Sequence, residues 1–329
     1  MRIDKQYRII DICILVLSQS CIDVDKRMDI SAEHPQLTLL NFWLDVEETS
    51  NSTSPPYCHL LIRQKEDVDS AVWDEIFAYI DHAHAGARQA LRAPLEDSLH
   101  PLQHNTDVDP AFRYPHKLGD TALKGFFGEI IAGIVAEYYA GDDEHEWEVP
   151  AYLFHTHVVA FQQLEVMKQT DDWERQIVGR TGDDGLAFAR DENGLIVAWL
   201  ACEAKCTGNH SSTLIRDNHV KLSQAVARPV DLLRLIDALK DYRDDDYSRN
   251  WIAALRRYWW DDSRNQSVSR CDFSMYVCGS CPRRNRTWIP TAAPHSGYTG
   301  QRNLTCAELH MVGVEGIIRS LYERMDNTS

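Results

Sequence analysis

The chain of 329 residues lacks several features that would assign it to common classes of protein. It has no apolar run of the roughly 20 residues that a membrane-spanning helix needs. Its best N-terminal candidate, residues 9–17, contains Asp11 and is not followed by a small-residue cleavage site, so it predicts a buried strand or short helix rather than a signal peptide. There is no Gly-x-Ser-x-Gly elbow and no phosphate-binding P-loop, so we do not expect the chain to hydrolyse ATP itself.

Dense cysteine and basic charge are also missing. The nine cysteines are scattered along the chain, whereas a disulfide scaffold is shorter and richer in cysteine, so we expect reduced thiols and a cytoplasmic location. Lysine and arginine number 34 against 50 acidic residues, which gives a formal net charge of −16. A chain this acidic repels nucleic acid over most of its surface, which argues against a stand-alone DNA-coating protein.

What is present indicates a folded α/β protein. The hydrophobic fraction of 44% is ample for a core, and the length suggests roughly two domains. A proline-rich stretch at 93–118 predicts a linker after a helix at 66–92. We therefore expect a smaller α+β module at 1–115, interpreted as a docking module for a partner, and an α/β domain at 116–329.

Hydrophobic periodicity outlines the second domain. It predicts a helix at 121–139, a β-prone segment at 152–161, a hairpin of strands 186–188 and 195–202, helical structure at 220–242 interrupted by Pro229, strands at 274–278 and 304–310, and a closing helix at 315–324.

Charged residues gather at the end of the predicted hairpin. The apolar run 195–202 leads into Glu203-Ala204-Lys205, and strand alternation puts Glu203 and Lys205 on one face. Asp184 stands at the start of the paired strand, beside them. Two carboxylates suit Mg²⁺ or Mn²⁺, and an ammonium group can stabilise charge that develops on a phosphate, as phosphodiester hydrolysis requires. The alternative is a surface hairpin whose charges only solvate the strand end.

Asp184 with Glu203-Ala204-Lys205 resembles the active-site motif of the PD-(D/E)XK, or restriction-endonuclease-like, nuclease superfamily, over roughly residues 120–320. The resemblance implies an αβββαβ core with a mixed central sheet flanked by helices. It also implies that Asp184, Glu203 and the backbone carbonyl of Ala204 bind the metal ion and that Lys205 is the catalytic lysine. The usual proline before the aspartate is absent, and Gly182-Asp183 stands there, so Asp183 is a second-choice ligand.

The helices on either side of the hairpin supply further candidates. Gly128 on the predicted helix 121–139 has no side chain and permits close approach of the helix to the sheet. Glu129 follows it, and the resemblance makes Glu129 a third carboxylate near the metal; the alternative is a solvated helical glutamate. Lys221 and Gln224 on the following helix are second-choice site residues, or solvated positions. Together these motifs resemble nuclease subunits of bacterial anti-phage defence systems, such as the Hachiman nuclease subunit, which works with a helicase. This implies a partner that is a helicase or another ATPase.

Basic charge is concentrated in residues 249–302, which hold nine arginines, no lysine and only three acidic residues, interleaved with tryptophan and tyrosine. Arginine can contact phosphates and aromatic rings can stack on bases. The candidate nucleic-acid-binding residues are Arg256, Arg257, Arg283, Arg284 and Arg286. The alternative is an aromatic core helix whose arginines pair with the abundant acidic residues.

The expected function is a Mg²⁺-dependent endonuclease of a bacterial defence or restriction system, with DNA favoured over RNA. One alternative is a catalytically inactive scaffold or regulatory subunit on the same fold. Another is a zinc-stabilised binding module built on Cys278 and Cys281, with Cys271, Cys306 and His310 as further ligands, although buried thiols are the favoured interpretation. His155 and His157 are interpreted as ordinary strand residues.

Overall fold

The computed structural model of the chain describes residues 35–51, 53–96, 109, 111, 114–115, 118–141, 144–154, 184–224, 229, 231–242, 245–261, 267–284 and 286–328. The segment 9–17, His155, His157 and Asp183 lie outside the described residues, as does most of the expected linker. None of the described helices is long and apolar enough to cross a membrane.

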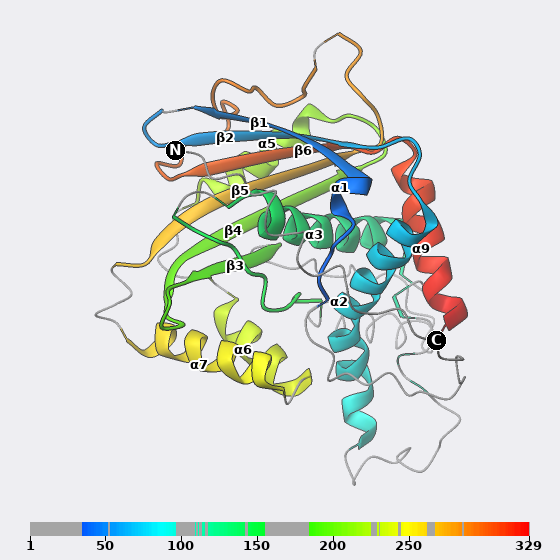
Figure 1. Cartoon of the computed structure of the whole chain (residues 1–329), viewed down its shortest axis with the longest axis vertical. Coiled ribbons are helices and arrows are strands. Elements are labelled where there is room, and N and C mark those ends of the chain that lie inside the picture. Colours follow the sequence, from blue (N-terminus) through cyan, green and yellow to red (C-terminus); the bar gives the residue numbers. More distant parts are fainter. Residues whose placement is uncertain are drawn as a thin grey trace, which may run out of the picture.

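A mixed six-stranded sheet organises the described residues, in the order β1-β2-β6-β5-β4-β3 (Figure 1). The strands are β1 Leu44–Asn51, β2 Tyr57–Gln64, β3 Gly185–Arg190, β4 Ile196–Thr207, β5 Ser269–Cys278 and β6 Leu304–His310. Antiparallel hairpins, β1–β2 and β3–β4, form the two edges, and the inner pairs β2–β6, β6–β5 and β5–β4 are parallel. The expected α/β class is therefore confirmed.

Helices cover both faces of this sheet (Figure 1). One face packs against α3 Asp120–Tyr139, with α2 Ser70–Glu96 and α9 Val314–Thr328 alongside; the other packs against α5 Ser212–Leu222, α6 Leu232–Tyr242 and α7 Asp246–Trp260. A short helix, α1 Leu40–Trp43, precedes β1. Side chains alternate along β4: Leu200 and Cys202 join the core cluster around α3, whereas Trp199 and Ala201 join the cluster on the α5 side.

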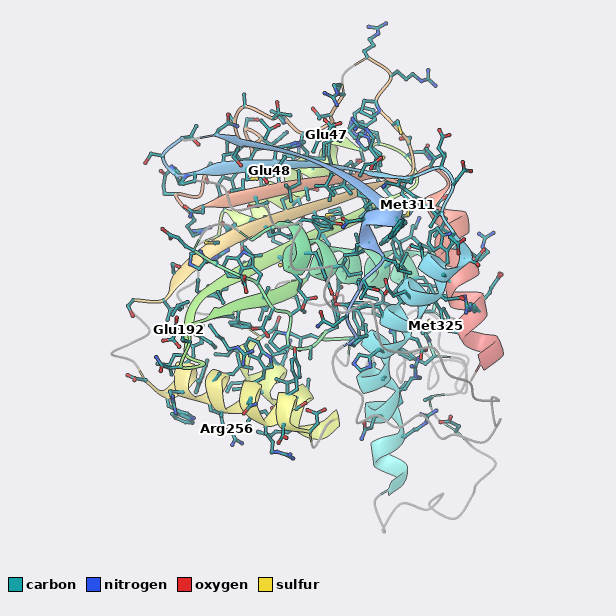
Figure 2. All side chains as sticks on the ribbon, viewed as in Figure 1. Glu47, Glu48, Glu192, Arg256, Met311 and Met325 are labelled. Atoms are coloured by element: carbon teal, nitrogen blue, oxygen red, sulfur yellow. The ribbon has the colours of Figure 1, made fainter. Side chains whose placement is uncertain are left out.

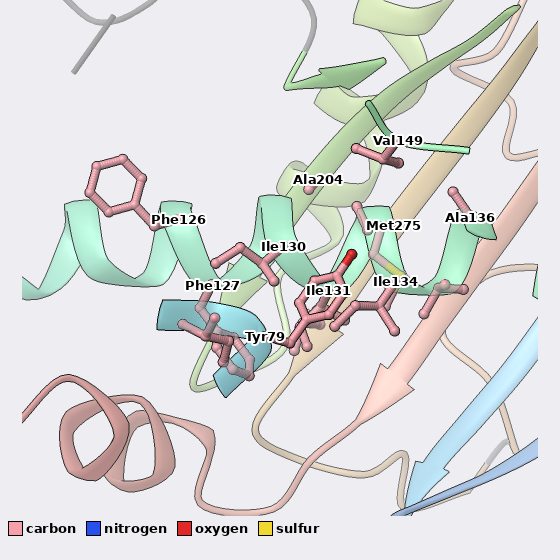
Figure 3. Close-up of a cluster of buried hydrophobic side chains, with 14 of the residues drawn as sticks. Tyr79, Phe126, Phe127, Ile130, Ile131, Ile134, Ala136, Val149, Ala204 and Met275 are labelled. Carbon is pink, nitrogen blue, oxygen red and sulfur yellow. The ribbon is translucent and has the colours of Figure 1, made fainter. Parts of the chain in front are cut away.

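Helix α3 is apolar almost all round, and its residues 126–136 are buried without interruption. Figure 3 shows this cluster, with Phe126 and Ile130 of α3 in the same core as Tyr79 of α2 and Met275 of β5. A Cβ atom at Gly128 would lie 3.2 Å from Cβ of Cys206 on β4. The absence of a side chain at this glycine therefore lets α3 approach the sheet closely, as the sequence predicts.

The expected boundary near residue 115 falls inside one continuous core. Strand β2 pairs with β6 over seven residue pairs, and the cluster around α3 contains Trp43 and Ile76 as well as Phe126 and Leu309. Residues 44–96 thus share a sheet and a core with the residues that follow 115. The partner-docking role of the first 115 residues stays a prediction.

Two elements near the site differ from their expected bounds. Strand β4 continues to Thr207 because β5 pairs with it as far as Cys278, so Glu203 and Lys205 lie inside the strand rather than just beyond its end. The helical structure expected at 220–242, with a kink or a break at Pro229, is two helices, α5 and α6, separated around Pro229. Helix α5 begins earlier than expected because the Ser211 side chain accepts a hydrogen bond from the Leu214 N–H and caps it.

Candidate active site

The β3–β4 hairpin brings Asp184 to the charged part of β4. Gly185 lies opposite Cys202, and the Asp184 N–H donates to the carbonyl oxygen of Cys202 at 3.1 Å, which extends the ladder by one residue. The Asp184 carboxylate is therefore held beside residues 203–205. Its Oδ2 atom accepts a hydrogen bond from the Ala204 N–H at 3.0 Å, which orients the carboxylate across the hairpin.

Lys205 binds the groups that the sequence predicts as its neighbours. Its Nζ atom lies 2.6 Å from Glu203 Oε1 and 3.5 Å from Asp184 Oδ2. It also donates to the carbonyl oxygen of Ala204 at 3.1 Å. Asp184, Glu203, Ala204 and Lys205 are thus brought together at one edge of the sheet, on its α5 side.

A second lysine enters from α5. Lys221 Nζ lies 3.1 Å from Asp184 Oδ1 and also contacts Glu203 Oε2. The sequence makes Lys221 only a second choice, and the structure places it in direct contact with both carboxylates. The other second choice, Gln224, lies past the end of α5 with an exposed side chain.

Asn218 holds α5 in the position that delivers Lys221. It lies one turn earlier on the same helix face and is only 1% exposed. Its Nδ2 atom is within hydrogen-bond distance of the Glu203 carbonyl oxygen (3.1 Å), Ser274 Oγ (2.9 Å) and the Met275 carbonyl oxygen (3.2 Å). Asn218 is not among the residues predicted from the sequence, although its spacing of three residues from Lys221 was a usable signal.

Burial and the two lysines separate the acidities of the two carboxyl groups. Burial, reinforced by the charge of Asp184, raises the pKa of Glu203 to about 7 against the opposing effect of the lysines. Burial also acts to raise the pKa of Asp184. The charges of Lys205 and Lys221 and the hydrogen bond from the Ala204 N–H outweigh burial, so the pKa of Asp184 lies below its ordinary value. Burial acts to lower the pKa of Lys221, but the two carboxylates outweigh it and raise that pKa.

Glu129 reaches the same region from the opposite side of the sheet. It is 9% exposed, so it is not the solvated helical glutamate that the sequence left as an alternative. Together with Asp184, Tyr152 and Leu186 it lines a small cavity at the β3 edge. Because α3 covers the other face of β4, Glu129 does not share a strand face with Glu203.

The donors at this edge fit a hard divalent cation. Asp184 and Glu203 supply carboxylate oxygens that both contact the ammonium group of Lys221. The Ala204 carbonyl oxygen contacts the ammonium group of Lys205. Mg²⁺ and Mn²⁺ prefer such oxygens and complete their shells with water. Within the described ranges no three His, Cys, Asp or Glu side chains are grouped so as to hold a metal ion, so the set that fits here is two side chains and one carbonyl.

The candidate nucleic-acid-binding arginines fall into two separate groups. Arg256 and Arg257 are exposed on α7, which contacts β4 near the β3 edge. Arg283, Arg284 and Arg286 follow β5, and Arg286 forms an ion pair with Glu47 on β1, the opposite edge of the sheet. Figure 2 shows Glu47 and Arg256 at opposite ends of the molecule. The arginines of segment 249–302 therefore do not form one basic surface.

Two other arginines of residues 249–302 pair with an acidic residue, as the alternative interpretation of this segment expects. Arg270 and Arg302 both pair with the fully buried Asp272, at 2.8 Å each. Through Arg302 this cluster joins strand β5 to the loop before β6. Both arginines are engaged with a buried carboxylate and are not exposed groups that could bind a phosphate.

The cysteines do not gather into a shared site among the described residues. Cys271 packs in the cluster on the α3 side of β5, whereas Cys278 and Cys306 pack in the cluster on the α5 side. Cys271 and Cys278 therefore face opposite sides of the sheet, because their positions on the strand differ by seven, an odd number. Cys278 is buried and Cys281 is exposed.

The chain was also compared with known proteins. No protein-family model matches the sequence, and no curated protein matches it.

Proposed function

We propose that the chain is a metal-dependent nuclease that hydrolyses phosphodiester bonds, with DNA as the favoured substrate. The observation that carries the proposal is the convergence of Asp184, Glu203 and Lys205, with the Ala204 carbonyl oxygen, at one edge of the sheet. Both carboxylates contact the ammonium group of Lys221, so they are close enough to share one cation. This closeness counts against the alternative of an inactive scaffold.

The order of elements around the site supports a restriction-endonuclease-like arrangement. Helix α3 is followed by the antiparallel pair β3–β4, then by α5 on the opposite face, then by β5 parallel to β4. The αβββαβ core needs one more strand before β3. Its expected position is 152–161, and of these only residues 152–154 are among the described residues.

The chain's own residues have distinct roles in the proposed hydrolysis. Asp184, Glu203 and the Ala204 carbonyl oxygen would hold Mg²⁺ or Mn²⁺, which would polarise the phosphate and lower the pKa of a bound water. Lys205 would stabilise the negative charge that develops on the phosphate oxygens in the transition state. The Ala204 N–H keeps Asp184 directed at the site, and the contacts of Lys205 with Glu203, Asp184 and the Ala204 carbonyl oxygen hold its ammonium group beside the carboxylates.

The proposal also includes a partner that delivers the substrate, a helicase or other ATPase of a bacterial defence system. The net charge of −16 and the separation of the two arginine groups both support weak binding of DNA by the chain alone. Tight, salt-sensitive binding of the purified chain to random DNA would contradict this part of the proposal.

Cleavage assays test the catalytic proposal directly. We expect plasmid DNA to be cut in the presence of Mg²⁺, with the partner if it is required, and to stay intact with EDTA. RNA in a parallel reaction tests the preference for DNA. Glu203→Ala and Lys205→Ala should each abolish cleavage while the circular dichroism spectrum stays that of the wild type. Glu192→Ala, in the exposed turn between β3 and β4, is the matched control and should cleave normally. Full activity of the Lys205→Ala protein would overturn the assignment.

A further inference from the structure

The two lysines divide the carboxylate oxygens of the site between them. Lys221 contacts Asp184 Oδ1 and Glu203 Oε2. Lys205 contacts the other oxygen of each residue, Asp184 Oδ2 and Glu203 Oε1. Two negative and two positive groups therefore alternate around the site. Such an arrangement is balanced in charge without a metal ion.

The ammonium group of Lys221 lies where a shared cation would have to act. It joins one oxygen of Asp184 to one oxygen of Glu203, as an ion bound by both residues would. A divalent cation needs its oxygen ligands at about 2.1 Å, closer than the roughly 2.8 Å of an ammonium contact, and it repels a neighbouring positive charge. Lys221 and the metal ion therefore compete for the same pair of oxygens.

We infer that Lys221 is a displaceable cation, which holds Asp184 and Glu203 together in the metal-free protein and must leave them when a divalent cation binds. The inference rests on the proposed metal-dependent function. It gives Lys221 a role in setting metal affinity, in addition to any role in catalysis. Once freed, this partly exposed ammonium group can donate hydrogen bonds to a phosphate of the substrate.

The surroundings of the two lysines identify Lys221 as the one that leaves. Lys205 is on the inner strand β4, and it also donates to the Ala204 carbonyl oxygen. Lys221 is in the last turn of α5, its side chain is 37% exposed, and among the described residues its ammonium group contacts only the two carboxylates. Its departure therefore breaks no contact other than those that the metal ion replaces.

Two contacts of the carboxylates do not involve Lys221 and can hold the site when it moves. In the metal-free structure the Ala204 N–H donates to Asp184 Oδ2 at 3.0 Å, and Lys205 Nζ donates to Glu203 Oε1 at 2.6 Å. Asp184 Oδ1 and Glu203 Oε2, the oxygens released by Lys221, are the ones left open to the cation.

Calorimetric titration of the full chain with Mn²⁺ tests the inference without any assay of activity. Lys221→Met removes the charge and preserves the length of the side chain, so Mn²⁺ should bind about tenfold more tightly than to the wild type. Lys221→Arg keeps the competing charge and should stay close to the wild-type affinity. Lys240→Met is the matched control, because Lys240 pairs with the exposed Asp237 on α6, and the Mn²⁺ affinity of this variant should equal that of the wild type.

Mn²⁺ binding by Lys221→Met that is equal to or weaker than that of the wild type would overturn the inference. If the wild type still cleaves DNA in that case, the proposed function stands. Absence of Mn²⁺ binding in both the wild type and Lys221→Met would overturn both. Lys221→Gln provides a second neutral variant should the methionine protein fail to fold.

Amine acetylation of the wild-type protein adds an independent measurement. The Lys221 peptide should be modified several times faster when Mn²⁺ is present, because the metal ion frees its amine, whereas the Lys240 peptide should not respond. An unchanged rate at Lys221 with saturating Mn²⁺ would contradict its displacement.

Discussion

The two faces of β4 have opposite chemistry. Toward α3 it presents Leu200, Cys202 and Ala204, which are all buried among apolar side chains. Toward α5, at the same end of the strand, it presents Glu203 and Lys205. Helix α3 is therefore held by apolar packing, whereas α5 is also held by hydrogen bonds and ion pairs at its C-terminal end. The comparison separates the face that stabilises the fold from the face on which the proposed chemistry takes place.

The largest effect on stability is expected on the α3 face. Phe126→Ala removes a fully buried ring that packs against His84 and Phe154, and should lower the free energy of unfolding by about 3–5 kcal/mol. Urea unfolding followed by circular dichroism measures the change. Phe42→Ala, at a 64% exposed ring, is the matched control and should change it by less than about 1 kcal/mol. Similar decreases in the free energy of unfolding for Phe126→Ala and Phe42→Ala would contradict the expectation that the core around α3 stabilises the fold.

A smaller loss of stability, combined with a loss of activity, is expected on the α5 face. Asn218→Ala leaves the buried Ser274 hydroxyl and the Glu203 and Met275 carbonyl oxygens without the Nδ2 donor, which should cost about 1–3 kcal/mol. It also loosens the turn that delivers Lys221. Thermal unfolding and cleavage measured on the same preparation test both effects. Asn209→Ala, at an exposed position after β4, should change neither. Unchanged stability of Asn218→Ala would show that these hydrogen bonds do not hold α5.

The pH dependence of metal binding is expected to be more modest. With its pKa at about 7, Glu203 is mostly protonated at pH 6 and mostly ionised at pH 8, and a metal ion has to displace the proton. Mg²⁺ should therefore bind about tenfold more tightly at pH 8 than at pH 6, which calorimetry can measure. Lys221 does not contribute to the change in affinity between pH 6 and pH 8, since its pKa lies above its ordinary value of 10.5. Affinity that is constant between pH 6 and pH 8 would contradict a protonated Glu203.

Sequence patterns anticipate the local part of the site. The Asn193-Gly194 turn and the alternation of apolar residues predict the β3–β4 hairpin, which brings Asp184 beside Glu203 and Lys205. The close approach of α3 at Gly128 is likewise predicted. These features depend on residues that are near in sequence or joined by one tight turn.

Contacts across the sheet could not be predicted in the same way. The choice between Lys221 and Gln224 depends on where α5 begins and how it crosses β4, and these are set by the Ser211 cap and the Asn218 contacts. The split of the arginine-rich segment arises because α7, before β5, packs against β4, whereas the segment after β5 reaches Glu47 on β1. Nearness in sequence therefore does not place Arg257 near Arg286.

The sequence by itself determined that two carboxylates and a lysine would meet on one hairpin, because side-chain alternation and turn geometry are local properties of the backbone. Only the tertiary structure decided that β1 and β2 extend the same sheet, and that a second lysine lies across both carboxylates. Those outcomes depend on long-range strand pairing and on the packing of a helix over a sheet, and the pattern along the chain carries no measure of either.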